Sequence, residues 1–194
     1  MKLVFRPLTP DLWPALEDLF GPNGACAGCW CMYWRVGSAY TKRSREKNRA
    51  DFEMVVRSGP PPGILAFDGD RAVGWCQITP RDAVPRLNRG RFTAPVDDLP
   101  VWSVSCFYIR PHHRKQGIMT ALIAAALKFA KERGAPALEA YPRETSARRS
   151  GSAIYTGIAA SFIRTGFREV ARPSHDRPIL RHDLKRVRVA KSDA

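Results

Sequence analysis

The chain has 194 residues, 44% of them hydrophobic and 26% charged, and a formal net charge of +14 at pH 7. This length suits one domain, and the composition excludes a disordered chain, a collagen-like repeat and a coiled coil. Five cysteines are too few for a disulfide scaffold. No apolar run is long enough for a membrane helix, and the N-terminus lacks the apolar segment of a signal peptide. We therefore expect a cytoplasmic protein with reduced cysteines.

The excess of positive charge bears on partners rather than on the fold. Basic residues gather at 42–49, 110–115, 143–149 and 181–191, but none of these stretches is an uninterrupted block. A nucleic-acid-binding protein that uses this basic surface is one hypothesis, although dispersed clusters do not favour it. We expect residues 1–184 to form a single domain, followed by a basic tail at 185–194.

The first sixty residues predict one strand and two helices. The strand is expected at residues 2–6. A helix over residues 10–20 follows, with Thr9 as its N-cap and Pro10 at its first position. A glycine-rich loop and the aromatic patch of residues 29–34 lead to a second helix over residues 44–58.

The rest of the chain is predicted to be mostly strands. These are expected at residues 64–67, 72–78, 101–109, 137–141, 167–172 and 179–184. Residues 80–100 are predicted to be a loop, and residues 117–133 a long amphipathic helix that ends at Gly134. A loop and a shorter helix are expected between the strand at residues 137–141 and the strand at residues 167–172. This order indicates an α/β (α+β) fold, in which helices cover both faces of one sheet.

The stretch that carries the chemistry is VSCFYIRPHHRKQGIMT, residues 104–120. A buried strand enters a basic turn, and the turn opens the long helix. The first turn of a helix has free N–H groups and a partial positive charge, and Arg114 and Lys115 add to that charge. Because Gly117 lets a ligand approach the backbone, the stretch fits a pyrophosphate. The alternative is an ordinary basic helix start on the surface.

Residues 109–119, IRPHHRKQGIM, resemble motif A of the GCN5-related N-acetyltransferases, the GNAT superfamily. Residues 162–170, FIRTGFREV, resemble the closing segment of the same family. The run GACAGCWCMYWR at residues 24–35 is similar to a little-characterised bacterial branch. The resemblance implies a mixed, twisted sheet whose central strands splay apart, with acetyl-CoA as co-substrate in the cleft between them.

The resemblance also implies binding residues for acetyl-CoA. Backbone groups of Phe107, Tyr108 and Ile109 would face the pantetheine arm. The pyrophosphate would be held by Arg114, Lys115, Gln116, Gly117, Ile118, Met119 and Thr120. Two residues depart from the family pattern. Met119 replaces the usual Gly or Ala, and Phe162 stands beside the cofactor where many members have a tyrosine that protonates the CoA thiolate.

The predicted activity is transfer of an acetyl group to a primary amine of a small molecule or a peptide. Such a transfer needs a neutral amine and a proton for the leaving thiolate. Glu139 is the candidate base, and the alternative for it is an ion pair with an arginine. Tyr155 is the candidate acid, and the alternative for it is packing. Family members often pair, so a homodimer is a further expectation.

Three cysteines, Cys26, Cys29 and Cys31, lie within six residues. Such a run offers thiolates to a metal, but a zinc site needs a fourth ligand and no second C-x-x-C exists. We therefore predict no metal site, and keep a metal-dependent thiol sensor built on these cysteines as a third hypothesis. By the family resemblance, the neighbouring aromatic residues line the acceptor pocket, and plain core packing is the alternative. These pocket candidates are Trp30, Tyr33 and Trp34.

Overall fold

The computed structural model describes residues 2–144 and 153–184, and these residues contain one seven-stranded sheet. The strands are β1 (Leu3–Pro7), β2 (Gly63–Asp68), β3 (Arg71–Pro80), β4 (Trp102–Ile109), β5 (Ala137–Ala140), β6 (Arg168–Ser174) and β7 (Arg177–Asp183). Their order is β1-β2-β3-β4-β5-β7-β6. The pairing of β4 with β5 is parallel and the other pairings are antiparallel, so the predicted mixed sheet is confirmed.

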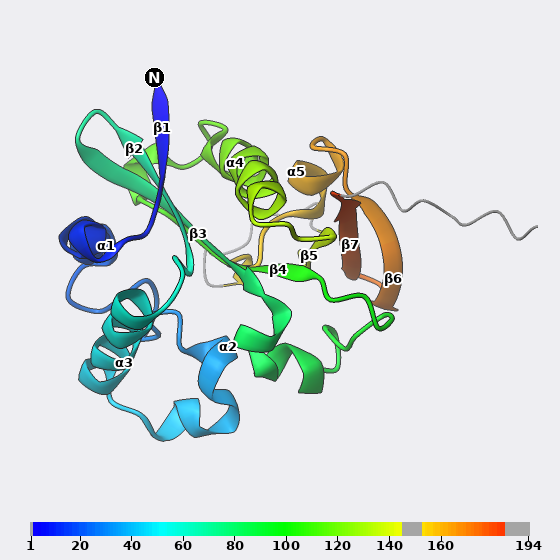
Figure 1. Cartoon of the computed structure of the whole chain (residues 1–194), viewed down its shortest axis with the longest axis horizontal. Helices are drawn as coiled ribbons and strands as arrows, with labels where there is room; N and C mark the ends of the chain where they lie inside the picture. Colours follow the sequence, from blue (N-terminus) through cyan, green and yellow to red (C-terminus); the bar gives the residue numbers. More distant parts are fainter. Residues whose placement is uncertain (1, 145–152, 185–194) are drawn as a thin grey trace, which may run out of the picture.

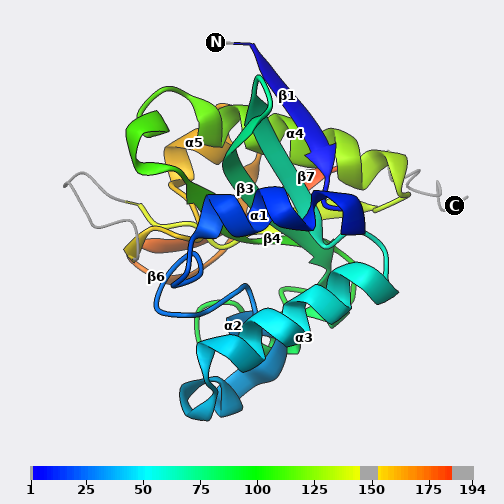
Figure 2. The same cartoon turned by 90° about the vertical axis from the view of Figure 1, so that its left-hand side faces the viewer.

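Helices cover both faces of the sheet, as predicted (Figures 1 and 2). They are α1 (Trp13–Phe20), α2 (Tyr33–Val36), α3 (Arg45–Ser58), α4 (Ile118–Glu132) and α5 (Ala159–Ile163). On one face, Leu122 and Phe129 of α4 pack into an apolar core with Val104 of β4. On the other face, α1 and α3 pack against Trp75 of β3 through side chains that include Phe52. Both layers bury apolar side chains from water, which is the main stabilising contribution to the fold.

Two details of the predicted elements need correction. Thr9 precedes a 3-10 turn, Pro10–Leu12, and its side chain makes no capping hydrogen bond, so α1 begins only at Trp13. The predicted loop over residues 80–100 contains two 3-10 turns, Arg81–Ala83 and Pro85–Arg89. Local turns of this kind need no long apolar repeat, and periodicity therefore does not reveal them.

The expected basic tail at 185–194 lies outside the described residues. None of the helices in the described segments is long and apolar enough to cross a membrane.

Candidate active site

The central strands β4 and β5 separate after a short parallel contact. They pair only over Trp102–Val104 and Leu138–Ala140 among the described residues. Residues 106–109 of β4 continue along β3, and a bulge leaves Ser105 without a partner on β3. Beyond the bulge, one edge of β4 therefore faces a gap instead of a neighbouring strand, which is the splayed arrangement expected from the sequence.

Backbone groups of β4 point into this gap and are met by two aromatic residues. The indole Nε1 of Trp34 donates to the carbonyl oxygen of Ser105 at 3.0 Å. The N–H of Phe107 donates to the carbonyl oxygen of Tyr155 at 2.6 Å. Buried peptide groups need such partners, and Trp34 and Tyr155 supply them for these two groups of the open edge.

The basic turn between β4 and α4 lies at one end of the gap. Lys115 and Gly117 have positive φ values of 62° and 79°, and Gly117 is the N-cap of the 15-residue helix α4. A Cβ at Gly117 would meet no atom within 4 Å, so the backbone there is open to a ligand. The guanidinium of Arg114 bonds the carbonyl of Ile109 at 3.0 Å, which holds its charge beside this helix start. The turn therefore fits an anion such as a pyrophosphate.

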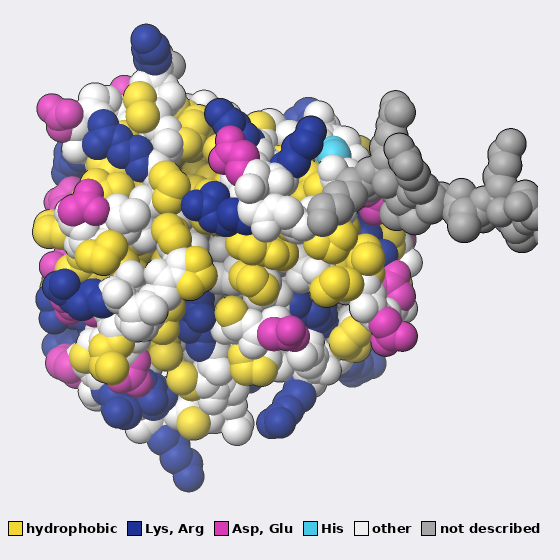
Figure 3. Space-filling model, viewed as in Figure 1, with side chains coloured by type: hydrophobic (Ala, Val, Ile, Leu, Met, Phe, Trp, Pro, Cys, Tyr) yellow, Lys and Arg dark blue, Asp and Glu magenta, His cyan; other side chains and the backbone are white. Residues whose placement is uncertain are grey.

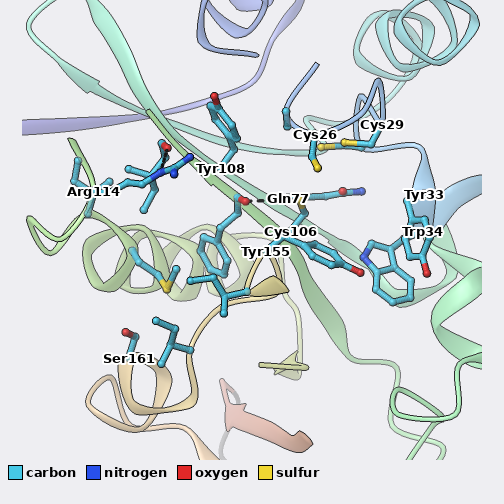
Figure 4. A pocket seen from close by; sticks show the side chains of 18 of the residues that line it. Cys26, Cys29, Tyr33, Trp34, Gln77, Cys106, Tyr108, Arg114, Tyr155 and Ser161 are labelled. Atoms are coloured by element: carbon cyan, nitrogen blue, oxygen red, sulfur yellow. Dashed lines mark hydrogen bonds between the residues drawn. The ribbon is translucent and has the colours of Figure 1, made fainter. Parts of the chain in front are cut away.

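The gap and the turn belong to one pocket of about 1100 Å³ (Figure 4). Its lining from β4, the basic turn and α4 consists of Phe107, Tyr108, Ile109, Arg114, Lys115, Gly117, Ile118, Met119 and Thr120. Its other lining residues are Ala25, Cys26, Ala27, Cys29, Cys31, Tyr33, Trp34, Tyr40, Gln77, Cys106, Ile154, Tyr155, Ile158, Ser161 and Arg164. The pocket is thus large enough for a nucleotide-sized ligand and a second molecule beside it.

An aromatic group forms one wall of the pocket. The rings of Tyr33 and Trp34 meet edge to face at 4.8 Å, and the ring of Tyr155 lies 6.3 Å from that of Trp34. Burial raises the pKa of the Tyr155 hydroxyl, so it keeps its proton at neutral pH. This wall presents flat apolar faces and the protonated hydroxyl of Tyr155.

Thiols form a second wall. Burial, and then the neighbouring Cys31, raise the pKa of Cys29 to about 11. A hydrogen bond with Cys31, and then burial, raise the pKa of Cys106 well above its ordinary value. These two thiols are therefore neutral at pH 7 and are poor nucleophiles. Within residues 2–144 and 153–184 no group of three or more side chains could hold a metal ion.

We expect Cys29 to resist alkylation at neutral pH. Its rate of reaction with iodoacetamide, followed by mass spectrometry, should rise about tenfold for each pH unit, because only the thiolate reacts. The rise should continue to pH about 11. A Cys29→Ser variant identifies the Cys29 signal. A plateau near the ordinary value of 9.0 would show that the thiol is less buried than the structure indicates.

A sequence model described as the acetyltransferase (GNAT) family matches residues 27–150, more than half of the chain. The chain belongs to this family. The matched residues include the splayed strand β4, the basic turn and helix α4, on which the sequence resemblance was based. Membership makes this protein an acetyltransferase, and acetyl-CoA is its co-substrate.

Solved structures of acetyltransferases have the same fold. A putative acetyltransferase of Salmonella typhimurium, yncA with acetyl-CoA, is 12% identical with a TM-score of 0.54, over 98% of this chain and 99% of that one. The PaiA N-acetyltransferase of Thermoplasma acidophilum, in complex with coenzyme A, is 13% identical with a TM-score of 0.52, over 94% and 99%. The ribosomal-protein-S18-alanine N-acetyltransferase of Escherichia coli is 12% identical with a TM-score of 0.51, over 95% of both chains. A comparison with curated proteins found no match.

Glu139 lies in a buried ion-pair cluster and does not line the pocket of this acetyltransferase. Its side chain is 1% exposed, and its carboxylate contacts Arg181 at 2.6 Å and Arg81 at 3.2 Å. The hydroxyl of Tyr141 also donates to it, at 3.1 Å. With both oxygens held by donors, Glu139 is not free to take a proton from an amine. This environment does not support the predicted general base, and it agrees with the alternative of an ion pair.

Three other predicted site residues lie outside the pocket lining. Trp30 is buried between Trp13 and Phe20, which agrees with the alternative of core packing. Phe162 is fully buried and packs edge to face against Phe107, so it supports the cofactor strand from behind. Gln116 is exposed on the basic turn, where its amide donates to a backbone carbonyl of the same turn at 3.0 Å.

Sequence reasoning missed several residues of the pocket. Gln77 and Cys106 face it from paired positions on β3 and β4, and Ser161 and Arg164 reach it from α5 and the residue after it. The sequence could have indicated Gln77, because it is a polar residue inside an otherwise apolar strand. Cys106 packs in the apolar core and also lines the pocket.

Proposed function

We propose that this acetyltransferase transfers the acetyl group of acetyl-CoA to a primary amine that enters between the aromatic and thiol walls. The observation that carries the proposal is the continuity of the pocket. One cavity joins the open edge of β4, the basic helix start and the aromatic wall. Two substrates can therefore meet in it without leaving the protein, and holding reactants together is a large part of catalysis.

Each part of the pocket has a task in this proposal. Backbone groups of residues 107–109, other than the N–H of Phe107 that bonds the carbonyl of Tyr155, align the pantetheine arm as an added strand would be aligned. The free N–H groups at the start of α4, with Arg114 and Lys115, hold the pyrophosphate. When bound, acetyl-CoA supplies the activated thioester carbonyl.

A proton donor for the leaving thiolate is also available. Tyr155 lines the pocket, and its raised pKa keeps the hydroxyl protonated at neutral pH, as a donor requires. The new C–N bond forms as the C–S bond breaks, Tyr155 gives its proton to the thiolate and regains the proton that the amine nitrogen loses, and the products are an amide and the CoA thiol. Replacement of Tyr155 by Phe keeps the ring in place and removes only the hydroxyl that carries this proton.

The alternative of nucleic-acid binding has no comparable observation in its favour. On the face shown in Figure 3, Lys and Arg side chains lie apart from one another and are mixed with Asp and Glu. A surface of this kind lacks the contiguous basic track that phosphate backbones prefer.

The experiment is an acetyl-transfer assay with purified protein, acetyl-CoA and a panel of primary amines, read by mass spectrometry of the acetylated product. The proposal predicts product that depends on both substrates, and a lower kcat with an unchanged KM for acetyl-CoA in the Tyr155→Phe variant. Acetyl-CoA binding without transfer to any amine would overturn it.

A further inference from the structure

The pocket contains a buried side-chain amide without a partner. Gln77 is 0% exposed to solvent, yet it lies in the pocket lining. Neither Nε2 nor Oε1 has a hydrogen-bond partner among the described residues. In Figure 4 its side chain extends toward the end of the pocket where Tyr33 and Trp34 lie. An unpaired buried polar group costs about 1–3 kcal/mol of stability, so this amide is placed for a ligand and not for the fold.

The walls around this amide are made of thiol and aromatic side chains. Thiols of Cys26, Cys29, Cys31 and Cys106 and the rings of Tyr33, Trp34 and Tyr40 line this end of the pocket. Over the described residues, the pocket lining has no Asp, Glu or His, and its charged side chains are all cationic. An ammonium group would therefore lose its hydration here and find no counter-charge, which is strongly unfavourable in a buried site.

Two arginines near the aromatic wall make the binding of a cation in this pocket still less favourable. The guanidinium of Arg86 lies 4.2 Å from the ring centre of Tyr33, so a positive charge already occupies one face of that ring. Arg35, next to Trp34 in sequence, has two buried guanidinium nitrogens without partners. A cage of aromatic rings can bind an ammonium ion, but these positive charges remove that advantage.

An amine that reacts in this pocket must consequently arrive uncharged. An alkylamine is protonated at pH 7 and needs a base before it can attack. The described lining has no carboxylate or imidazole that could act as this base, and Cys29 and Tyr155 hold their own protons. An amine bonded directly to an aromatic ring is uncharged at pH 7, and its ring suits flat aromatic walls.

We propose that the acceptor is a weakly basic amine carried on an aromatic ring, and that the side-chain amide of Gln77 binds it. This inference rests on the proposed acetyl transfer. Oε1 of Gln77 accepts a hydrogen bond from the amine N–H and orients its lone pair. Nε2 donates to an acceptor atom of the ring substituent. The amine nitrogen then forms the C–N bond, the C–S bond breaks, and the proton lost by nitrogen ends on the CoA thiol.

Aniline and benzylamine form a matched pair for the test. They differ by one methylene, but aniline is uncharged at pH 7 and benzylamine is an ammonium ion. The wild-type protein should acetylate aniline with a kcat/KM about 100-fold above that for benzylamine, since an unpaired buried charge costs several kcal/mol. Equal rates, or a preference for benzylamine, would overturn the inference while leaving the proposed transfer intact. No transfer to either amine or to any other, with acetyl-CoA bound, would instead overturn the proposed function.

Two variants of Gln77 separate binding from a structural role. Gln77→Met keeps the side-chain length, and should raise the KM for aniline about tenfold by removing the hydrogen bond between Oε1 and the amine. It should also raise the melting temperature, because it removes an unpaired buried amide. Gln77→Glu places a carboxylate in the pocket and should shift the preference toward benzylamine. A lower melting temperature for Gln77→Met with an unchanged KM would make Gln77 structural and overturn its assignment.

Discussion

A Gly117→Glu variant is expected to bind acetyl-CoA about 100-fold more weakly than the wild-type protein, a loss of roughly 2.8 kcal/mol. Two effects combine. The new carboxylate lies at the N-cap of α4, where it competes with the pyrophosphate for the same free N–H groups. It also repels the phosphates directly. Calorimetric titration of acetyl-CoA measures the loss.

The variant should still fold. The space beside Gly117 is open, so the substitution costs only the strain of a positive φ, about 1–2 kcal/mol. Gly134→Glu is the matched control, because Gly134 has a φ of 76° and equally open space but follows the other end of α4. It should bind acetyl-CoA normally. Equal losses in the two variants would mean that backbone strain, and not the anion site, explains the result.

The second large effect is expected at Glu139. Glu139→Ala should lower the free energy of unfolding by roughly 3–5 kcal/mol, because it leaves the guanidinium groups of Arg81 and Arg181 buried without their shared carboxylate. Arg181 keeps Asp97 at 2.7 Å, while Arg81 keeps only neutral acceptors among the described residues. Urea unfolding measures the change. The folded fraction should retain its affinity for acetyl-CoA.

Glu144→Ala provides the comparison for Glu139→Ala. Glu144 pairs with Arg172 at 2.8 Å in an exposed position, and exposed pairs contribute little to stability. The urea midpoint of the Glu144→Ala variant should therefore stay close to that of the wild-type protein. If Glu139→Ala instead kept full stability but lost acetyl transfer, Glu139 would be the general base after all.

The parts of the fold that sequence reasoning predicted well have strong local signals. Helix α4 has apolar residues at helical spacing along one face and ends just before Gly134. The basic turn before it follows from Arg114, Lys115 and Gly117, whose chemistry depends little on distant residues. For the same reason, the residues predicted to hold the pyrophosphate line the pocket, apart from Gln116.

The part of the pocket formed by residues 25–34 could not be predicted in the same way. Ala27, Trp30 and Cys31 all have positive φ values, so the chain reverses repeatedly between residues 24 and 32. Neither the period of a strand nor that of a helix then tells which aromatic side chain is buried. This is why Trp30 lies in the core while Tyr33, three residues later, lines the pocket.

Ion-pair partners that lie far apart along the chain could not be predicted from the sequence either. Glu139 is held by Arg81 and Arg181, which are 58 and 42 residues away along the chain. A carboxylate on a strand beside the cleft has the same local pattern whether it is a base or an ion-pair partner. Only the register of β5 with β7, which places Glu139 opposite Arg181, decides between the two.

The most direct test of the account is a crystal structure of the protein with acetyl-CoA. We predict the pantetheine arm along residues 107–109 and the pyrophosphate at the first turn of α4. The acetyl group should then face the pocket end where Gln77, Tyr33 and Trp34 lie. Acetyl-CoA bound elsewhere on the protein, or a pocket that stays empty at millimolar acetyl-CoA, would contradict the account.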